Sequence, residues 1–439
     1  MKYNRFCSKT SFVLICAGLL LSSCDKGPQM SFPKEDIIFD ASGLDTMTVH
    51  ISANVHWTAV IKQTDQWLKA DILKGEGDAI IKLAADENGE FAERIAFVVI
   101  TGDDVGTDSI RVIQTETIDV AEMIENETLK KYCLYLFDDS PQDGRISLKE
   151  AKSDESKIEN GQNIPKTKII IKGLQITTLA GIEYFTKIRE LNCENNLLEE
   201  IDISKNKEIR ILNCSYNSKI DRIDVSGLAR LSSLKLYNAN LTNIDVSKNE
   251  ALRELWVSNN SISSINVSNN KDLDILNCSN NLLTSLDVSK NSNLMNLSCT
   301  DNKLTTLNIS ANTKLATLYC SVNQLSNIDV RSNKDLQVLW CVQTGISNLD
   351  ITNNTNLSDL RCDNNNLTTL DLSHNTKLRD FSCSSNKIKN TIDISNNILL
   401  RYIDLKNNPE LTEIKVWQGF DIYNKDYYLK DDTADWVPK

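Results

Sequence analysis

Hydrophobic positions recur with a fixed period over the second half of the chain. One leucine position returns at intervals of 21 residues, with two intervals of 22. Its occupants are Leu191, Leu212, Leu234, Leu255, Leu276, Leu297, Leu318, Leu339, Leu360, Phe381 and Ile403. Each repeat follows the pattern L-x-x-L-x-C-x-x-N-x-L-x-x-L-D-V-S-x-N. Because no single repeat of this length can bury its own leucines, the period predicts a solenoid of stacked repeats over residues 169–416.

Each repeat contains two short triads in which apolar and polar positions alternate. The triad Leu276-Asn277-Cys278 predicts a short strand with its outer two side chains directed inward, stacked in parallel on its neighbours at about 4.8 Å. The triad Leu286-Asp287-Val288 repeats the alternation. Its outward column is Asp202, Asp224, Asp245, Asn266, Asp287, Asn308, Asp329, Asp350, Asp371 and Asp393. These carboxylates either recruit cations or accept hydrogen bonds from the turn that follows each of them.

A column of cysteines occupies the last position of the strand triad. Its members are Cys193, Cys214, Cys278, Cys299, Cys320, Cys341, Cys362 and Cys383. Leu236, Val257 and Leu405 take the same position in other repeats, so the position is an apolar pocket that buried free thiols would fill. Strained disulfides between neighbours and a metal site are the alternatives. No histidine or carboxylate completes a tetrahedral set of ligands, which weighs against a metal.

An asparagine column follows the cysteines at the turn that leaves the strand. Its members are Asn196, Asn217, Asn260, Asn281, Asn302, Asn323, Asn365, Asn386 and Asn408. Side-chain amides at this place are expected to satisfy buried backbone groups. Ala239 and Thr344 interrupt the column, and we expect the turn to be looser there.

The repeat resembles the leucine-rich repeat. Residues 172–188 resemble the degenerate first repeat of internalin-type proteins, and the segment YNKDYYLKDDTADW after Trp417 resembles the closing cap of related repeat proteins. The resemblance implies a curved solenoid that presents its strands on a concave face, with residues 417–439 as the C-terminal cap.

Residues 31–117 have a different pattern, in which apolar and polar residues alternate over short segments separated by Gly, Asp and Asn. The segments DIIFDA, TMTVHISA, WTAVIK, AIIKLAAD, RIAFVVIT and SIRVIQT predict strands of a β-sandwich. The succession Asn54, Trp57, Trp67, Gly75, Gly77, Asn88, Arg94 and Gln114 resembles the BACON domain of Bacteroidetes surface proteins. That resemblance implies an immunoglobulin-like sandwich that binds carbohydrate, with Trp57 and Trp67 stacking on sugars. Packing of both tryptophans in the core of a spacer domain is the alternative reading.

The connector, residues 118–168, predicts a helix, an acidic turn and a second helix. Aligning Gly144 with the invariant glycine of an EF-hand places Asp139, Asp143 and Glu150 at loop positions 1, 5 and 12. Pro141 falls at position 3, where an oxygen ligand is needed, so the three carboxylates are only a weak calcium candidate. A degenerate turn within an N-terminal cap, similar to those that precede leucine-rich repeats in bacterial surface proteins, is the other interpretation.

The N-terminus reads as an export signal. A basic start is followed by the apolar run FVLICAGLLL, of signal-peptide length, and by LSSC, which resembles the lipobox of bacterial lipoproteins. Residues 1–23 are therefore predicted to be a signal peptide, Cys24 the lipidated residue and residues 24–30 a linker. Lipidation implies a protein anchored to the outer membrane by its acyl chains alone, at the cell surface.

Candidate ligand contacts lie at outward positions of the strand triads, where the repeats stop resembling one another. Aromatic residues gather there as Tyr237 with Trp256, and as Tyr319 with Trp340 beside Arg361. Exposed aromatic and arginine side chains on a rigid strand are typical of binding hot spots. These five residues are the predicted binding patch.

Charge and motifs exclude several functions. The net charge of -12 argues against nucleic-acid binding, and no phosphate loop, zinc motif or nucleophile elbow predicts an enzyme or a cofactor. The expected fold is mainly β: an immunoglobulin-like β-sandwich, then a curved leucine-rich-repeat solenoid with N- and C-terminal caps. The expected function is recognition of an extracellular or host protein on the concave face. A carbohydrate- or mucin-binding protein acting through the BACON-like domain is the alternative, and a purely structural envelope protein is a third.

Overall fold

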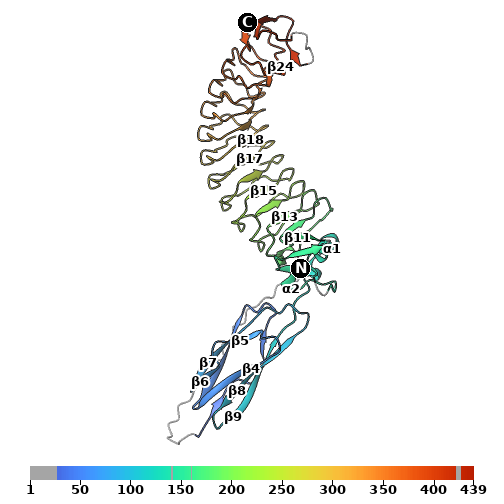
Figure 1. Ribbon diagram of the computed structural model, residues 1–439, viewed down its shortest axis with the longest axis vertical. Coiled ribbons are helices and arrows are strands. Elements are labelled where there is room, and N and C mark those ends of the chain that lie inside the picture. The colour runs from blue at the N-terminus through green and yellow to red at the C-terminus, as the bar shows by residue number, and fades with distance from the viewer. Residues whose placement is uncertain (1–26, 140–141, 160, 422–426) are drawn as a thin grey trace. The chain divides into compact units, whose positions relative to one another are not determined.

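The chain divides into two compact units, residues 1–116 and 117–439, each described here by itself. The computed structural model describes residues 27–139, 142–159, 161–421 and 427–439 (Figure 1). The predicted signal peptide and Cys24 lie outside these residues.

The first unit is built from two β-sheets around one apolar core. The four-stranded sheet has the order β1 (Met30–Ser31), β3 (Thr46–Ala53), β7 (Ala79–Ala85) and β5 (Leu68–Ala70). The five-stranded sheet has the order β2 (Ile37–Phe39), β9 (Gly106–Gln114), β8 (Arg94–Gly102), β4 (His56–Lys62) and β6 (Lys74–Glu76). Inward residues of both sheets form a single cluster, in accordance with the alternation along each strand.

Three residues that carry the BACON resemblance form a polar network in this unit. Asn88 is fully buried, and its Nδ2 donates to the carbonyl oxygen of Thr115 at 2.8 Å. The Nε2 of buried Gln114 donates to the carbonyl oxygen of Asp86 at 3.0 Å, while its Oε1 accepts from Arg94 Nε at 2.8 Å. These side chains therefore satisfy backbone groups where the strands end.

The second unit begins with a cap. A 3₁₀ turn (Val120–Met123), α1 (Glu127–Phe137), α2 (Leu148–Ala151) and the hairpin β10 (Ser156–Glu159) and β11 (Gln162–Pro165) precede the repeats. Asn126 caps α1, and Ser147 with Glu150 forms a capping box at α2. Leu129, Cys133 and other buried cap residues join the same core as the repeats, so the cap covers the first repeat.

The repeats form a parallel sheet of thirteen short strands along the inner side of a curved solenoid (Figure 1). Its strands are β12 (Lys168–Ile170), β13 (Glu190–Asn192), β14 (Ile211–Asn213), β15 (Ser233–Lys235), β16 (Glu254–Trp256), β17 (Ile275–Asn277), β18 (Asn296–Ser298), β19 (Thr317–Tyr319), β20 (Val338–Trp340), β21 (Asp359–Arg361), β22 (Asp380–Ser382), β24 (Tyr402–Asp404) and β26 (Tyr428–Leu429). The leucine positions pair in register from strand to strand, for example Leu276 with Leu297. The 21-residue period thus sets the register of the whole sheet.

The asparagine column joins each repeat to the one before it. Asn302 Nδ2 donates to the carbonyl oxygens of Cys278 and Cys299, both at 3.1 Å, and its Oδ1 accepts from the amide of Leu283 at 2.9 Å. The interruptions do not leave this turn open, contrary to our expectation. The Thr344 hydroxyl donates to its own repeat's Cys341 carbonyl at 3.0 Å, and beside Ala239 the Ile220 amide turns to the carbonyl oxygen of Asn217.

A second asparagine column, which the sequence reasoning missed, holds the opposite side of the coil. Asn291 is fully buried, and its Nδ2 donates to the carbonyl oxygens of Val267 and Asn270 at 3.0 and 2.8 Å. Equivalent bonds are made by Asn206, Asn249, Asn270, Asn312, Asn333, Asn354, Asn375 and Asn397. The final N of the repeat pattern was the available signal.

One residue of every complete turn after a strand has a left-handed backbone conformation. Asparagine, which tolerates this conformation, occupies about half of these positions, whereas Val322 has a φ of 53°. Replacing Val322 by asparagine should raise the free energy of unfolding by about 1 kcal/mol, because a β-branched residue is strained there. Urea denaturation measures the change. The reciprocal variant, Asn364→Val at a φ of 54°, should lose stability; a gain there would contradict the argument.

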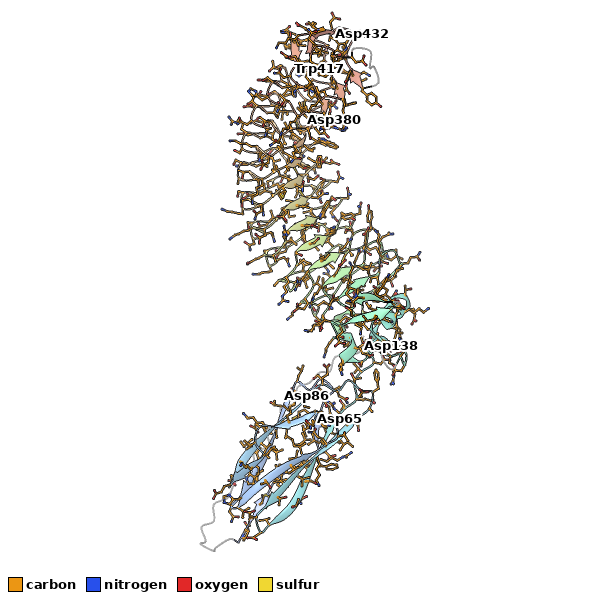
Figure 2. All side chains as sticks on the ribbon, viewed as in Figure 1. Asp65, Asp86, Asp138, Asp380, Trp417 and Asp432 are labelled. Atoms are coloured by element: carbon orange, nitrogen blue, oxygen red, sulfur yellow. The ribbon has the colours of Figure 1, made fainter. Side chains whose placement is uncertain are left out.

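An aromatic cluster closes the C-terminal end of the solenoid. The strands β23 (Asn390–Asp393), β25 (Leu411–Val416) and β27 (Asp435–Pro438) form a separate parallel sheet there. Phe420 contacts Trp417, Tyr428 and Trp436, with ring centroids 4.7 to 4.9 Å apart. Figure 2 places Trp417 near this end of the chain. These rings cover the core of the last repeat.

Candidate functional site

Three residues of the predicted binding patch come together on adjacent strands. Tyr319 ends β19, Trp340 ends β20 and Arg361 ends β21, and the pairing registers place the three side by side. The Tyr319 and Trp340 ring centroids are 4.8 Å apart at an interplanar angle of 63°. The Arg361 guanidinium carbon lies 4.4 Å from the centroid of the Trp340 ring. Trp340 is therefore held between Tyr319 and Arg361.

This arrangement determines which part of Trp340 a ligand can reach. Strands of a parallel sheet are about 4.8 Å apart, so large side chains in one column lie against each other. Tyr319 and Arg361 pack against the tryptophan from its two neighbouring strands, so Trp340 is only partly exposed. Sugar stacking needs an open ring face, whereas a protein side chain can pack against an edge.

The other two patch residues do not contact each other as predicted. Tyr237 contacts Tyr216, with centroids 5.2 Å apart, while Lys235 Nζ lies 5.7 Å from the centroid of Trp256. Tyr237 lies two residues beyond the end of β15, whereas Trp256 ends β16, so the two rings belong to different columns of the face. The five residues thus form two groups, and the tighter one is Tyr319, Trp340 and Arg361.

The residue that opens each strand faces the same side, and the sequence analysis did not consider it. This column contains Lys168, Glu190, Ile211, Ser233, Glu254, Ile275, Asn296, Thr317, Val338, Asp359, Asp380 and Tyr402. On β20, Val338 opens the strand and Val342 follows two residues after Trp340. Both valines are partly exposed, so Trp340 lies at the centre of a small apolar island. Period-2 alternation extended by one residue in each direction would have identified them.

Carboxylates border the apolar island on its C-terminal side. Asp359 pairs with Arg361 at 3.6 Å, and Asp380 with Arg401 at 3.0 Å. Burial raises the pKa of Asp359 and of Asp404 above the usual range of a carboxyl group. These carboxylates are only partly hydrated, which strengthens their interaction with any opposite charge.

The cysteine column is interior packing, as the pocket argument predicted. All eight thiols are buried, and none of them is bridged in the structure. Burial raises the pKa of Cys278 to about 12, and the pKa of Cys299 and of Cys320 is raised for the same reason. Protonated, buried thiols are unreactive, so the column offers no redox or nucleophilic chemistry.

The aspartate column stabilises turns. Asp287 Oδ1 accepts from the amide of Ser289 at 2.9 Å, and this bond with the one from the Ser289 hydroxyl lowers the pKa of Asp287. Asp329 accepts bonds from the Arg331 side chain and amide, which lower its pKa to about 2. The carboxylates therefore stay ionised in a stacked column through local hydrogen bonds, as one of the two interpretations expected.

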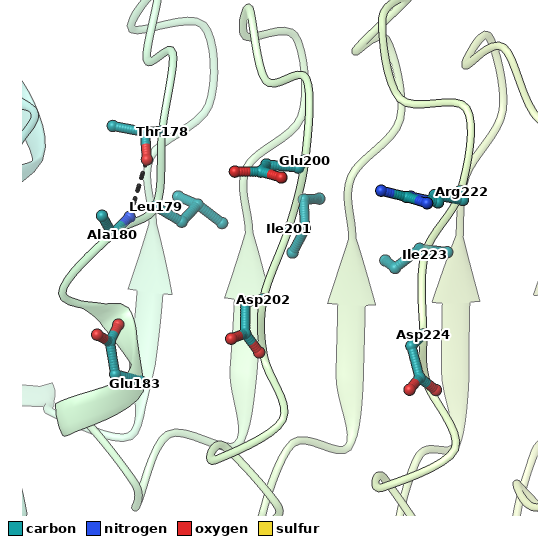
Figure 3. A pocket seen from close by; sticks show the side chains of 10 residues that line it. All are labelled: Thr178, Leu179, Ala180, Glu183, Glu200, Ile201, Asp202, Arg222, Ile223 and Asp224. Atoms are coloured by element: carbon teal, nitrogen blue, oxygen red, sulfur yellow. Dashed lines mark hydrogen bonds between the residues drawn. The ribbon is translucent and has the colours of Figure 1, made fainter. Parts of the chain in front are cut away.

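A depression lies over the first two repeats on this aspartate side. Its lining residues include Leu179, Ile201 and Ile223 with Glu183, Asp202 and Asp224 (Figure 3). Two of the carboxylates already serve the backbone: Glu183 Oε2 accepts from Gly181 N at 2.8 Å, and Asp202 Oδ1 from Ser204 N at 2.9 Å. Asp224 Oδ1 likewise accepts from Ser226 N at 2.8 Å, so Glu183, Asp202 and Asp224 are all committed to the backbone.

The carboxylates of the segment aligned with an EF-hand have partners within the chain. Asp139, at position 1, pairs with Lys166, whose side chain is 1% exposed. Glu150, at position 12, bonds Ser147 in the capping box and the Asp139 amide, and Asp143 bonds Arg145. In the described ranges no three His, Cys, Asp or Glu side chains are grouped as metal ligands. The three carboxylates of the weak calcium candidate thus have partners within the chain, Asp139 with the Lys166 ammonium group, and calcium binding there stays a prediction.

The two tryptophans considered for carbohydrate binding are core residues. Trp57 and Trp67 are each 1% exposed. Trp57 Nε1 donates to the Gly77 carbonyl oxygen at 3.1 Å, and Arg94 lies 4.9 Å from the Trp67 centroid. Neither ring offers a face to a sugar, so the stacking role is incorrect and the core-packing alternative holds.

An exposed apolar face on the five-stranded sheet was not foreseen. Ile38, Val60, Ile95 and Phe97 are 40 to 57% exposed, and Ile38 and Ile95 both pair with Ile113. The outer face of the other sheet is more polar, with exposed Thr46, Thr48, His50 and Lys82 beside Ile80. The consecutive apolar residues in RIAFVVIT were the available signal, since a one-sided strand would alternate strictly.

The fold is that of a leucine-rich-repeat solenoid of the internalin type. The functional domain of InlJ from Listeria monocytogenes, described as including a cysteine ladder, is 26% identical to this chain over 73% of it and 72% of that chain, with a TM-score of 0.63. An internalin, InlF, from Listeria monocytogenes str. 4b F2365 is 21% identical, covers 73% of this chain and 97% of its own, and has a TM-score of 0.57. The leucine-rich repeat domain of APL1B is 18% identical over 62% of this chain and 83% of that one, with a TM-score of 0.52. No protein-family model and no curated protein matches the chain.

The prediction of an internalin-like solenoid is thus confirmed. Such folds are typical of proteins that bind other proteins at surfaces. None of the helices in the described part of the chain is long and apolar enough to cross a membrane.

Proposed function

We propose that this is a lipid-anchored cell-surface protein that binds a protein ligand on the strand face of its repeats. The observation that carries the proposal is the apolar island around Trp340, fixed between Tyr319 and Arg361 on rigid strands. Aromatic and arginine side chains held in this way are typical of binding hot spots. The first unit, an immunoglobulin-like sandwich similar to BACON domains, acts as a stalk in this proposal.

Two observations favour a protein ligand over a glycan. The tryptophans of the first unit are buried, and Trp340 is packed against Tyr319 and Arg361 instead of standing alone as a platform for a sugar ring. A curved sheet also fits the surface of a folded partner.

Loss of the tryptophan should abolish ligand binding while the fold is retained. The full chain, the Trp340→Ala variant and the Tyr319→Ala variant are probed against a library of extracellular host proteins and a glycan array. We expect a protein partner whose affinity falls at least 30-fold in Trp340→Ala, as for a hot-spot residue worth about 2 kcal/mol or more. The exposed Tyr427→Ala serves as control and should bind normally. A partner bound equally by wild type and Trp340→Ala would refute the patch.

Membrane attachment rests on Cys24 and is tested separately. Cells fed an alkyne-bearing palmitate analogue should label the wild-type protein, and the Cys24→Ala variant should lose both the label and the membrane fraction. Protease treatment of intact cells should remove the wild-type repeats if the protein faces outward. An unlabelled wild type would contradict lipidation, and full protection from protease would contradict surface display.

A further inference from the structure

The carboxylates at the two ends of the strand face differ in whether a lysine or arginine of the chain pairs with them. Near its N-terminal end, Glu190 pairs with Lys168 and Glu194 with Lys172, each at 2.9 Å. Near its C-terminal end, Asp359 and Asp380 have arginine partners. Asp363 and Asp404 do not form an ion pair with any lysine or arginine that the structure describes. The N-terminal carboxylates are therefore neutralised within the chain, and two of the C-terminal ones are not.

The two uncompensated carboxylates are fixed by hydrogen bonds. Asp363 Oδ1 accepts from the Ser384 amide at 2.8 Å, from the Ser384 hydroxyl at 2.9 Å and from the Ser382 hydroxyl. Asp404 Oδ1 accepts from the Lys406 amide at 3.1 Å. In both residues Oδ1 is the oxygen that accepts. The second carboxylate oxygen, Oδ2, is left for an external partner. Lys406 is exposed beside Asp404 and reduces the local negative charge without closing an ion pair.

The strand between them leaves room for such a partner. Asp363 follows β21 and Asp404 ends β24, while β22 lies between these strands and presents Ser382, a small buried residue. On the other side of β21 lies β20, which carries the apolar island of Val338, Trp340 and Val342. Between the apolar island and Ser382 stands Arg361 of β21, which lies on the Trp340 ring and pairs with Asp359. The apolar island and the carboxylates of Asp363 and Asp404 are therefore one strand apart, and neither carboxylate is ion-paired with Arg361.

From this juxtaposition we infer the chemistry of the partner: its docking segment carries a lysine or arginine next to an apolar side chain. The apolar side chain packs on Val338, Trp340 and Val342, and the cation lies over Ser382 between Asp363 and Asp404. This inference rests on the proposed function, since it specifies what the strand face binds. Charge complementarity supports it, because partly buried carboxylates without cations cost free energy that an incoming cation removes.

A random dodecapeptide library displayed on phage and panned on the immobilised full chain tests the inference. We expect enriched peptides to contain lysine or arginine adjacent to an aliphatic or aromatic residue. An enriched peptide should lose at least tenfold in affinity for the Asp363→Asn/Asp404→Asn double variant, and its binding to wild type should weaken with added salt. Asparagine at position 363 keeps an oxygen for the Ser384 amide, so the thermal midpoint should stay close to that of wild type.

A matched control removes the same number of charges from the compensated end of the face. Glu190→Gln/Glu194→Gln should bind the enriched peptide as wild type does. Binding that is lost in Trp340→Ala but unchanged by both double variants and by salt overturns the inference and leaves the proposed function intact. Enriched peptides that contain neither lysine nor arginine would also overturn the inference and leave the proposed function intact. If no peptide depends on Trp340, the proposed patch itself is refuted, and this inference with it.

Discussion

Replacing Asn302 by alanine is expected to lower the free energy of unfolding by about 3 to 5 kcal/mol. The side chain is 7% exposed and joins two repeats, through the carbonyl oxygens of Cys278 and Cys299 and the amide of Leu283. Alanine leaves the Leu283 amide buried without this partner, which costs about 1 to 3 kcal/mol. It also removes one of two asparagine donors from each carbonyl oxygen, since Cys278 O also accepts from Asn281 and Cys299 O from Asn323, and each lost hydrogen bond costs about 1 kcal/mol. The loss is larger than that of an average substitution because three groups are affected together.

Urea denaturation of the full chain, followed by circular dichroism, measures the loss. Asn302→Asp should also destabilise, because a carboxylate cannot donate to the two carbonyl oxygens. The control is Asn327→Ala, an exposed asparagine of the next repeat, which should change stability by less than about 0.5 kcal/mol. Equal effects of Asn302→Ala and Asn327→Ala would show that the column does not hold the repeats together.

Replacing Asp139 by asparagine is expected to destabilise the N-terminal cap by about 3 kcal/mol. Lys166 has a side chain only 1% exposed, and Asp139 neutralises its ammonium group. Removing one partner of a buried pair leaves a buried charge and costs about 3 to 5 kcal/mol. The lower end applies here because Asp139 itself is 41% exposed.

A second substitution separates the charge from the packing. Lys166→Met removes the buried charge that Asp139→Asn leaves without a partner, so the Asp139→Asn/Lys166→Met double variant should recover much of the loss. Thermal and urea denaturation provide the values, and millimolar calcium should not shift the wild-type midpoint. The exposed pair Lys69 and Asp86 provides the control, since Asp86→Asn should have little effect. A double variant no more stable than Asp139→Asn, or a calcium-dependent midpoint, would contradict this account of the loop.

The binding patch was predictable in part. The positions of Tyr319, Trp340 and Arg361 on neighbouring strands follow from counting 21 residues, and the structure places them in contact. The pairing of Tyr237 with Tyr216 did not follow. Tyr216 has a left-handed backbone at the turn, and side chains there project in directions that strand alternation does not describe.

By itself, the sequence determined the solenoid, its register and the identity of its inward columns. These properties are local and repeated, so a residue's burial follows from its position within one repeat and is reinforced by every neighbour. Only the tertiary structure decided which side chains neutralise which charges: Lys166 is set against Asp139 although they are 27 positions apart, and Asp363 and Asp404 form no ion pair with a lysine or arginine in the described part of the chain. No period relates such partners, because they meet where a cap folds onto the repeats or where neighbouring strands differ in their outward residues. The burial of Trp57 and Trp67 was likewise decided by tertiary packing, since alternation fixes the side of a strand but not which side is covered.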